Sequence, residues 1–121
     1  MQKHVLIVDD EAPIREILAL MLGQNGYRVT EAATVGEAQQ VFQRDPPDLL
    51  ISDLQLEDSD GLMMIAELKK SMPNLPVILL TGVLFEDDVV RDTLSKVITA
   101  YLPKTTPLAK ILDEVRRALP S

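Results

Sequence analysis

The chain has 121 residues, of which 46% are hydrophobic and 26% are charged, which fits one globular domain with a single core. Its formal net charge of −7 argues against direct binding of nucleic acid. With no cysteine, no secretion signal and no apolar run of membrane-spanning length, we expect a cytoplasmic protein that has no disulfides and does not enter a membrane.

Short aliphatic or β-branched runs alternate with longer amphipathic segments along the chain. The runs have the length of strands, and most are apolar at nearly every position, which is typical of strands covered on both faces. They cover residues 4–8, 28–31, 49–52, 77–80 and 98–102. We therefore predict five strands.

Local signals mark the ends of the helices between these runs. Pro13 fits the first turn of the first helix, and Thr34 with Glu37 forms a capping box ahead of the second. Pro73 closes the third. The helical patterns cover 14–22, 38–42, 62–70 and about 107–119. One more helix, the fourth of five in chain order, is expected between 81 and 101.

Five strands alternating with five helices predict a parallel sheet with helices on both faces, in which ligands bind beyond the carboxyl ends of the strands. The residues expected at that edge are Asp9, Asp10, Glu11, Asp53, Thr81, Gly82 and Lys104. Crowded carboxylates repel one another, and a hard divalent cation such as Mg²⁺ offsets that repulsion. One aspartate can then attack phosphorus, while a lysine and a hydroxyl meet the phosphoryl oxygens.

Four motifs in register carry a resemblance to a known family. LIVDDE, LLISDLQLEDSDG, VILLTG and AYLPK occur in the order, and nearly at the spacing, of receiver domains of bacterial two-component response regulators. The chain resembles that family over essentially its whole length. The resemblance implies a single receiver domain over 1–121 with a doubly wound α/β fold. Its five-stranded parallel sheet would have the order 2-1-3-4-5, in a flavodoxin-like three-layer sandwich.

The resemblance also assigns roles to residues. Asp53 matches the phosphoacceptor, and Thr81 and Lys104 match the residues that hold the phosphoryl group. Magnesium, or manganese in its place, would be held by Asp9, Asp10, Asp53 and the backbone carbonyl of Gln55, with Asp10 as a direct ligand and Asp9 acting through water. Thr81 and Tyr101 match the switch residues.

The function implied by this family is a phosphorylation-dependent switch. A sensor histidine kinase or phosphotransfer protein would supply the phosphoryl group, and slow hydrolysis would remove it, so the chain is expected to be a signalling protein and not an enzyme. An output domain or effector protein would read the change. A homodimer through the face made by the fourth helix, fifth strand and fifth helix is compatible with this function.

Some positions depart from the family pattern. Glu57 stands where a proline is usual, and Gly82 stands where an alanine is common. Thr105 follows Lys104 where the family often has a proline after a cis bond. Because a cis bond before a non-proline residue costs about 3–4 kcal/mol, we predict a trans bond there or visible strain.

Other interpretations use parts of the same pattern. A Mg²⁺-dependent phosphohydrolase would form the same aspartyl phosphate, but it usually needs a second acid where this chain has Gln55, and a cap segment. A flavodoxin-like carrier would need a hydroxyl-rich first loop and aromatic residues, which make up only 3% of the chain. Asp9 and Asp10 could also be solvated acids that cap a helix. His4, the one histidine, is expected to be an exposed residue at the start of a strand.

Overall fold

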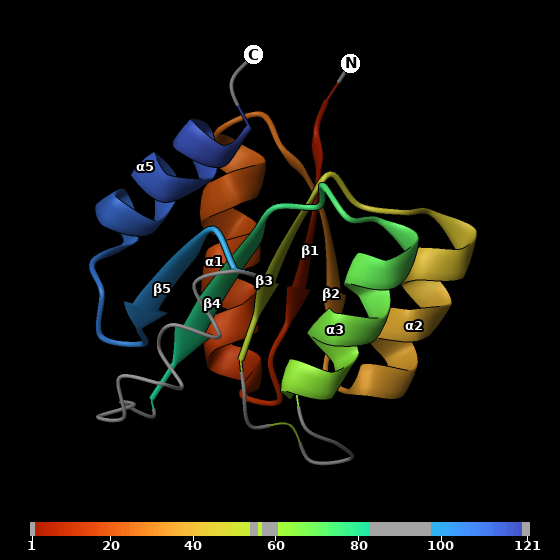
Figure 1. The fold of residues 1–121 in the computed structure, drawn as a ribbon. Coiled ribbons are helices and arrows are strands. Elements are labelled where there is room, and N and C mark those ends of the chain that lie inside the picture. The colour runs from red at the N-terminus through yellow and green to blue at the C-terminus, as the bar shows by residue number, and fades with distance from the viewer. Residues whose placement is uncertain (1, 54–55, 57–60, 83–97, 120–121) are drawn as a thin grey trace.

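The computed structural model describes residues 2–53, 56, 61–82 and 98–119 of the chain (Figure 1). Strands and helices alternate along these residues. In chain order they are β1 (His4–Val8), α1 (Ala12–Gln24), β2 (Arg28–Ala32), α2 (Val35–Arg44), β3 (Leu49–Ser52), α3 (Gly61–Ser71), β4 (Val77–Thr81), β5 (Ala100–Pro103) and α5 (Leu108–Ala118). The fourth helix that the sequence predicts falls outside the described residues.

The five strands form one parallel sheet in the order β2-β1-β3-β4-β5, which confirms the predicted fold class and strand order. β1 lies between β2 and β3 and pairs with both of them in parallel. The reversal of strand order on either side of β1 is the topological switch point of this fold. The carboxyl ends of the strands therefore meet at one edge of the sheet.

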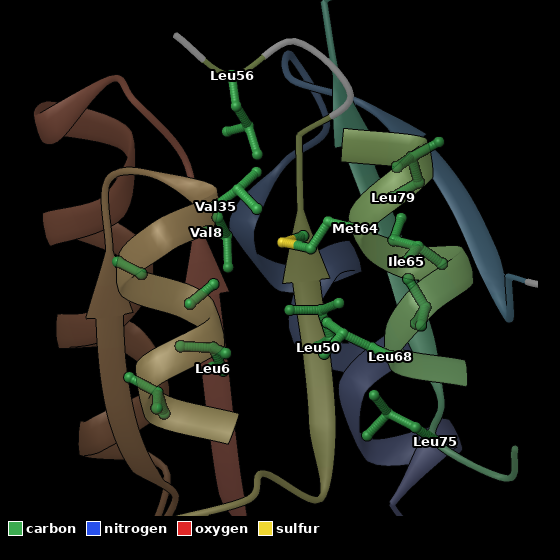
Figure 2. Close-up of a cluster of buried hydrophobic side chains, with 14 residues drawn as sticks. Leu6, Val8, Val35, Leu50, Leu56, Met64, Ile65, Leu68, Leu75 and Leu79 are labelled. Atoms are coloured by element: carbon green, nitrogen blue, oxygen red, sulfur yellow. The ribbon is translucent and has the colours of Figure 1, made fainter. Parts of the chain in front are cut away.

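Helices cover both faces of the sheet, and each face has its own core (Figure 1). Alternate residues of a strand point to opposite faces, so Leu6 and Leu50 pack with α2 and α3, whereas Ile7 and Ile51 pack with α1 and α5. Figure 2 shows the α2–α3 core, in which Met64 and Leu68 lie over the strands. Burial on both faces explains why the central strands are continuously apolar.

The strand and helix ends follow the predicted signals closely. β1 and β3 have the predicted bounds, and β2 and β4 each extend one residue further. β5 begins at Ala100, two residues later than predicted, because the ladder to β4 starts where Ala100 pairs with Ile78. The hydroxyl of Thr34 accepts a hydrogen bond from the Glu37 N–H at 3.2 Å, which confirms the predicted cap of α2.

The backbone is regular over the described residues. It contains no cis peptide bond there, so the predicted trans bond between Lys104 and Thr105 is confirmed. Among the described residues only Gly26 has a positive φ, of 90°, in the turn that leads from α1 to β2. None of the helices in the described ranges is long and apolar enough to cross a membrane.

The prediction that His4 is exposed is wrong. The side chain is buried, with 1% of its surface exposed. Its Nε2 lies 2.7 Å from Oγ1 of Thr30 and its Nδ1 lies 3.4 Å from the carbonyl oxygen of Pro46. Both ring nitrogens of His4 therefore have a polar partner inside the protein. Thr30 lies on the neighbouring strand β2, and Pro46 lies in the segment that leads into β3.

Candidate functional site

Strand ladders fix the backbone of the residues that follow the strands. The N–H of Asp53 donates to the carbonyl oxygen of Val8 at 3.0 Å, directly after β3. The N–H of Lys104 donates to the carbonyl oxygen of Thr81 at 3.0 Å, directly after β5. Each of these residues therefore extends the sheet by one hydrogen bond, and its side chain is held at the carboxyl edge by the rigidity of the core below.

The ammonium of Lys104 lies among three carboxylates. Its Nζ is 2.7 Å from Oδ2 of Asp53, 2.9 Å from Oε1 of Glu11 and 3.1 Å from Oδ2 of Asp9. The side chains of Asp9 and Asp53 are 3% and 6% exposed, whereas that of Glu11 is 57% exposed. Two buried acids and one solvated acid thus share a single base.

Four acidic side chains gather at this edge: Asp9, Asp10, Glu11 and Asp53. Each can offer one carboxylate oxygen, and the four oxygens lie within 4.8 Å of one another. Carboxylate oxygens are the ligands preferred by hard cations such as Mg²⁺. The donor set therefore fits a divalent metal better than a soft transition metal, since no sulfur or imidazole takes part in this group.

The surroundings of Asp9 and Lys104 shift the pKa of each group. Desolvation raises the pKa of the Asp9 carboxyl above its ordinary value, although hydrogen bonds from the Glu11 N–H and from Lys104 act in the opposite direction. Burial would lower the pKa of Lys104, but hydrogen bonds to Asp53, Glu11 and Asp9 outweigh it and raise that pKa. Lys104 is therefore a permanent cation at neutral pH.

Two residues near the site were given no role from the sequence. The N–H of Glu11 donates to Oδ1 of Asp9 at 2.8 Å, and Nη1 of Arg15 donates to the backbone oxygen of Asp9 at 2.7 Å. Nε of Arg15 also lies 3.6 Å from Oε1 of Glu31, the penultimate residue of β2. The only sequence signal for Glu11 was its place directly after two aspartates, and Arg15 offered none.

The remaining predicted site residues take varied positions. Asp10 is exposed at the mouth of the cluster, and Thr81 is fully buried at the end of β4. Tyr101 is partly buried and packs against the α2–α3 core from β5. Gln55 and Glu57 lie outside the described residues, so the predicted carbonyl ligand of Gln55 has no described position.

Comparison with known sequences points to one family. The family model of the response regulator receiver domain matches residues 5–116. The chain is 33% identical to the response regulator MprA of Mycobacterium leprae, over 96% of this chain and 50% of MprA. It is 40% identical to the transcriptional regulatory protein GlrR of Escherichia coli, over 65% of this chain and 18% of GlrR. The chain thus spans half or less of the length of these relatives.

Comparison with solved structures gives the same result. A CheY-like response regulator receiver domain protein from Methanospirillum hungatei JF-1 has a TM-score of 0.89 and 27% identity, covering 97% of this chain and 93% of its own. The non-phosphorylated HemR receiver domain of Leptospira biflexa has a TM-score of 0.88 and 27% identity, covering 99% and 96%.

Proposed function

Since the chain belongs to the response regulator receiver domain family of two-component systems, we propose that it is a phosphorylation switch with Asp53 as the phosphoacceptor. One observation carries this proposal. The carboxylate of Asp53 is buried at the carboxyl edge of the sheet, 2.7 Å from a lysine ammonium and within an acidic cluster suited to a divalent cation. A nucleophile, a permanent cation and a set of metal ligands are thus within reach of one another.

Asp9, Asp10 and Asp53 would hold Mg²⁺, or Mn²⁺ in its place, together with the backbone carbonyl of Gln55. A bound divalent cation neutralises negative charge on phosphoryl oxygens and on the carboxylates around it. The chemistry of the donor set supports this assignment, because the cluster holds four carboxylates, and Lys104, which contacts three of them, leaves an excess of negative charge. Their mutual repulsion makes a further cation favourable.

The proposed transfer is a substitution at phosphorus. A carboxylate oxygen of Asp53 bonds to phosphorus while the bond from phosphorus to a histidine nitrogen of the donor breaks, and the imidazole leaves with its electron pair. The Lys104 ammonium and the Thr81 hydroxyl donate hydrogen bonds to phosphoryl oxygens. Attack by water later releases phosphate and restores the carboxylate. Only these two slow, stoichiometric steps are proposed, so the domain acts in signalling and not as an enzyme that turns over a substrate.

The output follows from the added charge. The acyl phosphate carries a charge of about −1.5 to −2 at the buried end of the sheet, in place of the single negative charge of the carboxylate. We propose that Thr81 moves toward it and that Tyr101 repacks, which alters the surface of β5 and α5 on which partners dock. The donor is a sensor histidine kinase or phosphotransfer protein in the cytoplasm, and the reader is an output domain or effector, or a second copy of the chain. GlrR and PhoB, which this chain resembles in part, are transcriptional regulatory proteins.

The test is labelling with acetyl phosphate in the presence of Mg²⁺, followed by intact-mass measurement. We expect a mass gain of one phosphoryl group that depends on Mg²⁺ and is absent in Asp53→Asn, which keeps the shape of the side chain. Asp113→Asn, an exposed acid on α5, is the matched control and should be labelled as the wild type is. Labelling that persists in Asp53→Asn would show that another residue is the nucleophile. Sustained hydrolysis of a phosphomonoester would instead favour a phosphohydrolase.

A further inference from the structure

We infer that Glu11 is a positioning residue for Lys104, which keeps the lysine ammonium beside Asp53 when a divalent cation engages Asp9 and Asp53 and before the phosphoryl group arrives. This inference rests on the proposed function. Because Glu11 belongs to the acidic cluster, it could also be taken for a further metal ligand. The contacts of Lys104 distinguish the two roles.

The ammonium group has three N–H donors, and all three are used by carboxylates. The distances from Nζ are 2.7 Å to Asp53, 2.9 Å to Glu11 and 3.1 Å to Asp9. Charge-assisted hydrogen bonds of this length are the strongest that a lysine makes. Three carboxylates therefore hold Lys104 in this position, and any one of them could be lost without releasing it.

A divalent cation in the site would weaken two of these three contacts. Asp9 and Asp53 are the buried members of the acidic cluster, so a divalent cation bound there would compete with the ammonium for the same oxygens and repel it. The carboxylate of Glu11 is mostly solvated, at 57% exposed, and stays available to Lys104.

The backbone of Glu11 is anchored by two hydrogen bonds. Its N–H is held by Oδ1 of Asp9, and its carbonyl oxygen accepts the N–H of Arg15 as α1 begins. Its side chain therefore starts from a fixed point at the mouth of the site. Without this carboxylate, a long lysine side chain that has lost its buried partners would gain rotamer freedom by turning to solvent.

The first experiment measures the motion of Lys104 by NMR relaxation of its Cε methylene, with and without Mg²⁺. In the wild type we expect Lys104 to be restrained in both conditions. In Glu11→Gln we expect restraint without Mg²⁺ and fast motion at saturating Mg²⁺. The matched control is Glu16→Gln, which removes the same charge from an exposed position of α1. A Lys104 that stays restrained in Glu11→Gln with Mg²⁺ would overturn the inference.

The second experiment measures the rate of labelling by acetyl phosphate at saturating Mg²⁺. We expect Glu11→Gln to slow labelling by about 2- to 5-fold, the effect of one solvated ion pair, and Glu16→Gln to leave the rate unchanged. Glu11→Asp keeps the charge but shortens the side chain, so it should behave like Glu11→Gln if position matters. A wild-type rate in Glu11→Asp, or equal rates in Glu11→Gln and Glu16→Gln, would overturn the role of Glu11.

A combination of variants separates this role from an effect on the metal. In a Lys104→Met background, removing Glu11 should change the labelling rate by less than about 2-fold, because the group on which Glu11 acts is gone. An undiminished effect would assign Glu11 to the metal and overturn the inference. Failure to label the wild type would overturn the proposed function instead, and the relaxation measurement would still decide whether Glu11 holds Lys104.

Discussion

The ammonium nitrogen of Lys104 lies 2.7 Å from Oδ2 of Asp53, so the chain itself supplies a cation at the point where buried carboxylates meet. Lys104 reaches this point from beyond β5, and it also contacts Asp9, 95 residues away in sequence. The lysine therefore ties the carboxyl ends of β1, β3 and β5 together. Its charge must matter for stability as well as for chemistry.

Lys104→Met should destabilise the metal-free protein. The variant keeps most of the apolar volume but leaves the buried carboxylates of Asp9 and Asp53 without their cation, at a cost of about 1–3 kcal/mol. Urea denaturation in the presence of a chelator measures this change. Lys110→Met, on an exposed position of α5, is the control and should stay within about 0.5 kcal/mol of the wild type. Equal stability of the two variants would contradict the structural role of Lys104.

Asp9 should make the metal-free protein less stable as the pH rises. Burial raises the pKa of this carboxyl, so the native state binds its proton more tightly than the unfolded chain does. Stability then falls as the pH rises from the ordinary pKa of aspartate, about 3.9, through the raised native value, and it stays reduced at neutral pH.

Asp9→Asn tests this linkage because its amide does not titrate there. The free energy of unfolding of the variant relative to the wild type should increase between pH of about 4 and about 7, measured with a chelator present. Asp113→Asn is the exposed control, for which the difference from the wild type should not change over this range. A difference for Asp9→Asn that stays constant with pH would contradict the raised pKa.

The fold was predictable because the pattern of burial is simple. Strands covered on both faces are apolar at nearly every position, and 4–8, 49–52 and 77–80 met that condition apart from His4 and Ser52 at two strand ends. The start of β5 was misjudged because Ile98 is as apolar as the strand residues that follow, and only the pairing of Ala100 with Ile78 decides where the ladder begins. Such a pairing is a tertiary property that no local window contains.

Strand order predicted which residues gather at the site, but not the contacts that their side chains make. The rule that parallel strands end at one edge brought Asp9, Asp53 and Lys104 together, and the structure places them in contact. The same rule says nothing of which way a side chain turns, so the contact of Glu11 with Lys104 was not foreseen. His4 was misjudged for a similar reason, since its partners Thr30 and Pro46 come from elements distant in sequence.

Thr34→Ala should cost about 1 kcal/mol of stability through the loss of a helix cap. The Thr34 hydroxyl accepts the N–H of Glu37, and the Glu37 carboxylate in turn accepts the N–H of Ala33 at 2.7 Å. Because the two bonds support each other, the effects of Thr34→Ala and Glu37→Ala should not add in the double variant. Urea denaturation of the single and double variants tests this, with Gln39→Ala in the exposed face of α2 as the control.

His4→Ala should destabilise the protein by about 2–4 kcal/mol, although a histidine at the start of a strand looks dispensable from the sequence. The change leaves a cavity below β1 and removes the partners of the Thr30 hydroxyl and the Pro46 carbonyl. Lys3→Ala, one residue earlier and exposed, should shift the free energy of unfolding by no more than about 0.5 kcal/mol. A similar small shift for His4→Ala would mean that the ring is not buried in solution.

Mg²⁺ should stabilise the wild type by about 1.4 kcal/mol at ten times its dissociation constant, because only the folded chain gathers the carboxylates. Asp10→Asn and Asp9→Asn remove the same charge, so comparing them separates ligation from general electrostatics. Asp10 is exposed at the mouth of the cluster, whereas Asp9 is buried and already bound to Lys104 and to the Glu11 N–H. As the proposed direct ligand, Asp10 should contribute more to Mg²⁺ affinity than Asp9, for which we propose binding through water. Thermal denaturation against Mg²⁺ concentration measures both affinities, and a larger loss in Asp9→Asn would reverse this assignment of the ligands.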